Sequence, residues 1–209
     1  MRAEQVIRYA SSESRDGGEA TFGTYNFIVA PHCDDEMIGC YGIIRAASPL
    51  SPVAVLPCQF GYDDLSVRLD ETRHALNMAA QDEHVHTSIL RPVNPLALCE
   101  SLTKRCESTL DTMTLSYCVC WFPDPDFETH PQHKLVGQIG RYFAEMNANA
   151  DTPIIVGFYS VNMKAPYVRT LPEEDRQFKR AILFSSFKSQ LGYFNSHGEA
   201  AIFEGRVLI

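Results

Sequence analysis

Two short polar segments of the chain combine side chains that can bind a metal ion. The first, PHCDDE, spans residues 31–36 and places His32 beside three consecutive acids. Adjacent carboxylates repel one another unless a cation or a helix N-terminus neutralises them. Capping of a helix that starts near Glu36 would account for Asp34 and Asp35. Capping leaves His32 unexplained, whereas a bound metal would use both the histidine and an acid.

The second segment, PDPDFETHPQHK, spans residues 123–134 and contains His130 and His133. Two solvated histidines are one interpretation of this pair. The other is a ligand pair, because the two residues stand three positions apart where a loop meets a predicted helix. The remaining histidines outside the first segment are expected to face solvent: His74, His84 and His86.

Apolar runs typical of strands alternate along the chain with longer segments of helical period. Strands are predicted over 25–30, 52–57, 85–90, 117–122 and 153–160, and helices over 36–47, 65–80, 96–113, 132–148 and 173–190. This alternation predicts an α/β fold, a single Rossmann-like domain with a mostly parallel sheet flanked by helices on both faces. Residues 1–24 are predicted to be a polar, loosely ordered arm, and residues 25–209 to form the domain.

Each polar segment directly follows a predicted strand. Because the carboxyl ends of parallel strands meet at one edge of a sheet, the two loops can converge there. His32, Asp35 and His133 would then supply two nitrogens and one oxygen and leave a fourth position open to water, as in hydrolytic zinc sites. The same ligand set describes non-haem Fe(II) oxygenases. Those enzymes commonly use all-β barrels, so the predicted fold favours hydrolysis.

Composition excludes several other functions. The chain carries a formal net charge of −8 and no basic run, which argues against nucleic acid as a partner. It has no apolar stretch long enough to span a membrane and no secretory signal, so we expect a cytoplasmic protein. The seven cysteines are odd in number and lack CxxC spacing, which predicts buried, reduced thiols. The first turn has no GxGxxG motif to bind a dinucleotide, and the sequence does not predict an oligomeric state.

The two polar segments also resemble a known family. PHCDDEMIGCYG followed by HPQHKLVG is similar to the PHPDDExxGxGG and HPDHxxxG signatures of the PIG-L/LmbE family of metal-dependent N-acetylglucosaminide deacetylases. VRLDETRHAL is similar to the RxxExxxA helix of that family, and KRAILFSSFKSQ to its late KxxAxxxxxSQ element. The resemblance covers residues 25–192.

The resemblance implies a metal site and an activity. His32, Asp35 and His133 would bind Zn²⁺, or alternatively Fe²⁺, and Asp34 would be the general base. The reaction would remove the N-acetyl group from an N-acetylglucosamine-type amino sugar or its conjugate, with metal-bound water as the nucleophile.

The resemblance implies two further roles. His130 would be the electrostatic or acid partner, as an imidazolium whose pKa is supported by Glu128. Arg68 would contact the substrate; the alternative is a helix salt bridge with Glu71.

Three positions depart from the family signatures. Cys33 replaces proline, Tyr41 replaces a small glycine and Gln132 replaces aspartate. These differences give some support to a catalytically inactive, sugar-binding member of the same fold. The intact histidines and acids of both segments argue against that alternative.

Overall fold

The computed structural model describes residues 23–58, 65–80, 84–90, 94–113, 115–148, 153–162, 165, 169–197 and 203–208. Residues 1–22, which make up most of the predicted N-terminal arm, lie outside this part of the chain.

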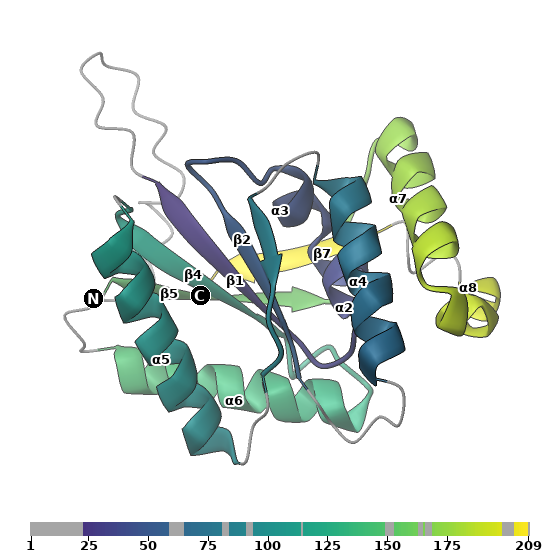
Figure 1. Cartoon of the computed structure of the whole chain (residues 1–209). Coiled ribbons are helices and arrows are strands. Elements are labelled where there is room, and N and C mark those ends of the chain that lie inside the picture. Colours follow the sequence, from purple (N-terminus) through teal and green to yellow (C-terminus); the bar gives the residue numbers. More distant parts are fainter. Residues whose placement is uncertain are drawn as a thin grey trace.

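A seven-stranded sheet forms the centre of the molecule (Figure 1). Its strands are β1 (Thr24–Ala30), β2 (Val53–Pro57), β3 (Val85–Thr87), β4 (Tyr117–Pro123), β5 (Ile154–Ser160), β6 (Arg169–Thr170) and β7 (Phe203–Leu208). They are arranged in the order β3-β2-β1-β4-β5-β7-β6, and the first five of these run parallel. The prediction of a mostly parallel sheet is therefore confirmed.

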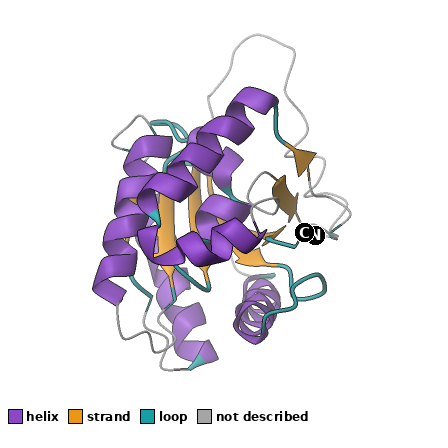
Figure 2. Cartoon of the chain, turned by 90° about the vertical axis from the view of Figure 1, so that its right-hand side faces the viewer, coloured by secondary structure: helices purple, strands orange, loops and turns teal. Residues whose placement is uncertain are grey.

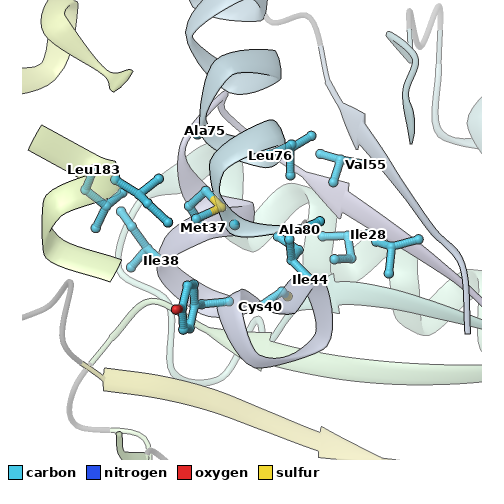
Figure 3. Close-up of a cluster of buried hydrophobic side chains, with 14 of the residues drawn as sticks. Ile28, Met37, Ile38, Cys40, Ile44, Val55, Ala75, Leu76, Ala80 and Leu183 are labelled. Atoms are coloured by element: carbon cyan, nitrogen blue, oxygen red, sulfur yellow. The ribbon is translucent and has the colours of Figure 1, made fainter. Parts of the chain in front are cut away.

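Helices cover both faces of the sheet, as the turned view of Figure 2 also shows. They are α2 (Asp35–Gly39), α3 (Tyr41–Arg45), α4 (Leu65–Ala79), α5 (Pro95–Thr112), α6 (Pro131–Asn147), α7 (Glu173–Ser186) and α8 (Leu191–His197), with a 3₁₀ turn η1 (Lys188–Gln190) before α8. Alternate residues of a strand point to opposite faces. Ile28 of β1 accordingly belongs to the core cluster on the side of α2, α3, α4, α7 and α8, part of which Figure 3 shows, whereas Phe27 and Val29 belong to the cluster on the side of α5 and α6. Seven buried, free cysteines contribute to this core, as predicted.

One predicted helix is interrupted. The sequence pattern predicts a continuous helix over 36–47, but the structure divides it into α2 and α3 at Cys40. In a continuous helix the Ile38 carbonyl would accept the amide N–H four residues on. It instead accepts a hydrogen bond of 2.6 Å from Nζ of the buried Lys179, on α7. A contact between distant parts of the chain thus accompanies the break.

The C-terminal segment, for which the sequence predicts no element, adds a strand to the sheet. β7 pairs antiparallel with β5, and β6 pairs with β7. The predicted helix over 173–190 ends earlier, at Ser186, and continues as η1 and α8.

Candidate metal centre

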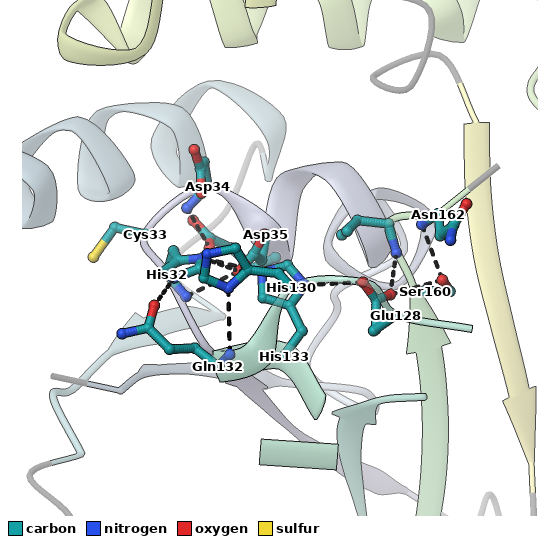
Figure 4. A network of polar contacts seen from close by, with 12 residues as sticks. His32, Cys33, Asp34, Asp35, Glu128, His130, Gln132, His133, Ser160 and Asn162 are labelled. Carbon is teal, nitrogen blue, oxygen red and sulfur yellow. Dashed lines mark hydrogen bonds and ion pairs between the residues drawn. The ribbon is translucent and has the colours of Figure 1, made fainter. Parts of the chain in front are cut away.

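The two polar segments lie side by side at the carboxyl ends of β1 and β4. These strands are neighbours, and the strand order reverses its direction between them. In open α/β sheets, ligands bind at such a switch point. The convergence predicted from the sequence is therefore confirmed. Figure 4 shows the side chains of both loops pointing toward one another.

Three donor atoms form a compact triangle at the centre of the site. His32 Nδ1 and His133 Nε2 each lie 3.1 Å from Asp35 Oδ2 and 3.0 Å from each other. Asp35 and His133 are 4% and 5% exposed, which rules out a solvated His133. Asp34 occupies the N-cap position of α2, but its carboxylate makes no capping hydrogen bond, so capping does not explain the acids.

The outer nitrogen of each of the two histidines meets a side-chain oxygen. His133 Nδ1 lies 3.0 Å from Glu128 Oε2, and His32 Nε2 lies 2.6 Å from Gln132 Oε1. These oxygens can only accept hydrogen bonds, so the outer nitrogen of each histidine carries the proton and donates it to the bond. In the neutral rings the inner nitrogens then present lone pairs toward the Asp35 carboxylate. Such an arrangement is repulsive unless a cation lies between the three atoms.

The donor set fits a small divalent metal ion. Metal–ligand bonds of about 2.0 to 2.2 Å in a tetrahedral site keep ligand atoms roughly 3.3 Å apart, close to the spacing of this triangle. Without a metal ion, the same repulsion favours protonated histidines next to an ionised Asp35. Burial lowers the pKa of His133, but the Asp35 and Glu128 carboxylates raise it to about 10. Burial raises the pKa of Asp35, yet the two histidines bring it well below its usual range. A metal ion would take the place of these protons.

Glu128 is part of the metal centre but not in the role expected from the sequence. Its Oε1 accepts hydrogen bonds from Ser160 Oγ (2.7 Å) and from the Val161 amide (2.9 Å), while Oε2 contacts His133. We predicted that Glu128 would support an imidazolium at His130. Glu128 does act to raise the pKa of His130, but burial and the neighbouring histidines outweigh it. The carboxylate contacts His133 instead, and Ser160 and Val161 at the end of β5 hold it there.

His130 lies at the open side of the triangle. It is exposed, and one of its ring nitrogens lies within 4.8 Å of nitrogens of both His32 and His133. Its Nδ1 accepts the Gln132 amide N–H at 3.3 Å and so caps α6. Burial and the two neighbouring histidines lower the pKa of His130, which contradicts the predicted imidazolium. The neutral ring carries its proton on Nε2.

A His32–His130–His133 set is an alternative ligand group for a metal. The spacing favours Asp35 as the third ligand, because its Oδ2 lies 3.1 Å from both inner nitrogens. His130 Nδ1 is already engaged in capping.

Asp34, which is buried, and Arg68, which is half-buried, form an ion pair beside the triangle. Arg68 donates from one terminal nitrogen to the Cys33 carbonyl (2.9 Å), and the same nitrogen lies 3.3 Å from Asp34 Oδ2. Burial and the adjacent Asp35 charge raise the pKa of Asp34, while Arg68 opposes the shift. Burial likewise raises the pKa of Glu36 to about 8; its carboxylate accepts from the Asp34 amide and from Thr72 Oγ1.

The two other segments that resemble family motifs, VRLDETRHAL and KRAILFSSFKSQ, contact each other. Glu71 on α4 accepts hydrogen bonds from the Ser189 amide (2.8 Å) and from Ser189 Oγ (2.6 Å), at the turn before α8. The carboxylate of Glu71 therefore anchors the late SQ element one helical turn from Arg68. Of the three histidines expected to face solvent, His74 and His86 are exposed and His84 is half-buried.

No protein-family model matches the chain, and no curated protein matches it. Solved structures do match. N,N'-diacetylchitobiose deacetylase from Pyrococcus horikoshii aligns with a TM-score of 0.59 at 15% identity, covering 100% of this chain and 93% of that chain. The zinc-inhibited form of teicoplanin deacetylase Orf2 aligns with a TM-score of 0.54 at 14% identity, covering 82% of this chain and 86% of that chain.

These likenesses confirm the predicted Rossmann-like α/β fold. The fold also occurs in GalB, the 4-carboxy-2-hydroxymuconate hydratase of Pseudomonas putida, which aligns with a TM-score of 0.54 at 10% identity over 89% of this chain and 96% of that chain. The fold alone therefore does not select a reaction; the residues of the site must do so. Among the described helices, none is long and apolar enough to cross a membrane.

Proposed function

We propose that the chain is a metal-dependent hydrolase that removes the N-acetyl group from an N-acetylglucosamine-type amino sugar or its conjugate. His32, Asp35 and His133 would hold one divalent ion, Zn²⁺ or alternatively Fe²⁺. The observation that carries the proposal is the triangle of donor atoms, 3.0 to 3.1 Å apart, with both outer imidazole nitrogens directed at oxygen acceptors. A bound divalent ion polarises an amide carbonyl and makes water more acidic.

Asp34 is the proposed general base. Burial and the Asp35 charge raise the pKa of Asp34, and a base is most effective when its pKa lies near the working pH. Arg68, 3.3 Å from Asp34 Oδ2, holds this carboxylate in place. Since Asp35 is committed to the metal triangle, the two adjacent acids have separate tasks.

His130 is the proposed donor to the oxyanion that develops on the amide oxygen. Its Nδ1 accepts the Gln132 amide, so its Nε2–H is available to donate as a neutral imidazole. A single oxyanion donor is typically worth about 10²- to 10³-fold in rate. Arg68 remains the candidate for a substrate contact, because its guanidinium lies beside the proposed base Asp34.

The alternative of an inactive sugar-binding member has less support, because residues suited to act as base, metal ligands and oxyanion donor lie close together. The test is to purify the protein without a histidine tag, measure its metal content by plasma mass spectrometry, and follow acetate release from a panel of N-acetyl sugars with and without chelator. We expect about one metal per chain and chelator-sensitive acetate release.

Two results would count against the proposal. Metal binding without acetate release from any N-acetyl sugar would favour the inactive member or another reaction of this fold. A protein that takes up no Zn²⁺ or Fe²⁺ after reconstitution would refute the metal site itself.

A further inference from the structure

Gln132 makes two contacts that reach both loops of the site. Its side-chain Oε1 lies 2.6 Å from His32 Nε2, and its backbone amide donates to His130 Nδ1 at 3.3 Å (Figure 4). Gln132 follows Pro131 in the first turn of α6, and His133 comes directly after it. One residue thus contacts a proposed metal ligand and the proposed oxyanion donor.

We infer that Gln132 is a positioning residue that fixes the tautomer of His32 for metal binding. The inference rests on the proposed function, because it concerns the same metal site. An imidazole binds a metal only through a nitrogen without a proton, so the proton of neutral His32 must stay on Nε2. The Gln132 amide oxygen accepts a hydrogen bond from that N–H, with 2.6 Å between Oε1 and Nε2. The lone pair of Nδ1 is thereby directed at the triangle.

The two ligand histidines are held by partners of different charge. His133 is oriented by the Glu128 carboxylate, whereas His32 is oriented by a neutral amide. Asp35 and Glu128 together carry two negative charges, which balance a divalent ion, and Gln132 adds none. A carboxylate at position 132 would make His32 a more basic ligand, and His32 would then bind the ion more tightly.

The experiment measures the Zn²⁺ affinity of the metal-free protein by competition with a chromogenic chelator. It compares four proteins: wild type, Gln132→Leu, Gln132→Glu and Gln138→Leu. Leucine removes the acceptor, and we expect affinity to fall about 10- to 100-fold. Glutamate keeps an oxygen at the same reach, so affinity should equal or exceed that of wild type. Gln138 is exposed on the same helix and serves as the matched control.

A second readout separates positioning from a structural role. The backbone amide of residue 132 still caps α6 in all variants, so the thermal midpoint of metal-free Gln132→Leu should stay close to that of wild type. In nitrogen-15 spectra of the zinc-loaded wild type, His32 should carry its proton on Nε2.

Wild-type affinity in Gln132→Leu, or a His32 proton on Nδ1 in the zinc form, would overturn the inference and leave the proposed hydrolase intact. Failure of the wild type to bind Zn²⁺ would instead overturn the proposed metal site, and the inference with it.

Discussion

Replacing Glu128 by glutamine removes one charge from the metal centre and almost no volume. In the native protein, Oε1 accepts from Ser160 Oγ and the Val161 amide, and Oε2 accepts from His133 Nδ1. An amide has only one oxygen. If that oxygen stays with Ser160 and Val161, the NH₂ group faces His133 Nδ1, which must then accept, and the ring proton moves to Nε2, the nitrogen of the triangle.

That tautomer of His133 cannot bind the ion through Nε2. Loss of such an orienting partner typically lowers metal affinity about 10- to 100-fold, equivalent to about 1.4 to 2.7 kcal/mol. If the amide instead turns its oxygen to His133, the half-buried Val161 N–H faces an NH₂ group. Metal affinity is then preserved, but the unsatisfied amide costs about 1 to 3 kcal/mol of folding free energy.

The assay for Glu128→Gln therefore measures both quantities: Zn²⁺ affinity by chelator competition and the free energy of unfolding of the metal-free protein by urea titration. Asp126→Asn, an exposed acid of the same loop that pairs with Arg141, is the matched control; it should leave Zn²⁺ affinity unchanged and change stability by less than about 1 kcal/mol. If Glu128→Gln left both affinity and stability at wild-type values, the assignment of Glu128 as the residue that orients His133 would be refuted.

Three further predictions concern the roles of the site residues, the packing of the helix that carries His133, and the pH dependence of stability. Asp34→Ala should retain its metal and lose about 10²-fold or more in turnover, whereas His133→Ala should lose both; equal metal loss in the two variants would contradict the assigned roles. Gly137→Ala should destabilise the protein by about 1 to 3 kcal/mol in urea unfolding, because the new Cβ would lie 2.4 Å from a backbone oxygen at the end of β4. Gly192→Ala, which meets nothing within 4 Å, is its control and should be neutral or stabilising. In the metal-free protein, the pKa values of His133 and Glu36 are raised to about 10 and about 8, so the folded state binds protons more tightly than the unfolded state. The stability from Glu36 and His133 is complete below their ordinary pKa values of 4.5 and 6.5 and is lost as pH rises through their folded-state values of about 8 and about 10. The free energy of unfolding should therefore decrease from about pH 6 to about pH 9; a flat or rising profile would argue against the burial of Glu36 and the pairing of His133 with Asp35 and Glu128.

The parts of the site that depend on strand ends could be predicted from the sequence. His32 and Asp35 follow β1, His133 follows β4, and parallel neighbours bring such residues to one edge of the sheet. Local periodicity was also sufficient for α4, α5 and α6, whose bounds lie within about two residues of the predicted ranges.

Contacts between distant residues could not be read from local patterns. The Lys179 bond to the Ile38 carbonyl joins residues 141 positions apart and accompanies a break in a helix that the apolar pattern predicts as continuous. The strand β7 depends on pairing with β5 rather than on its own composition. The partner of Glu128 depends on side-chain direction, which motif spacing does not encode. The N-acetyl sugar substrate, the metal identity and the cytoplasmic location stay predictions.

The most direct test of the metal centre is anomalous X-ray scattering at the zinc edge from crystals of the zinc-loaded protein. We predict one peak within bonding distance of His32 Nδ1, Asp35 Oδ2 and His133 Nε2, with Glu128 and Gln132 hydrogen-bonded to the outer nitrogens of His133 and His32. A peak bound by His130 in place of Asp35, or zinc found only elsewhere on the molecule, would contradict it.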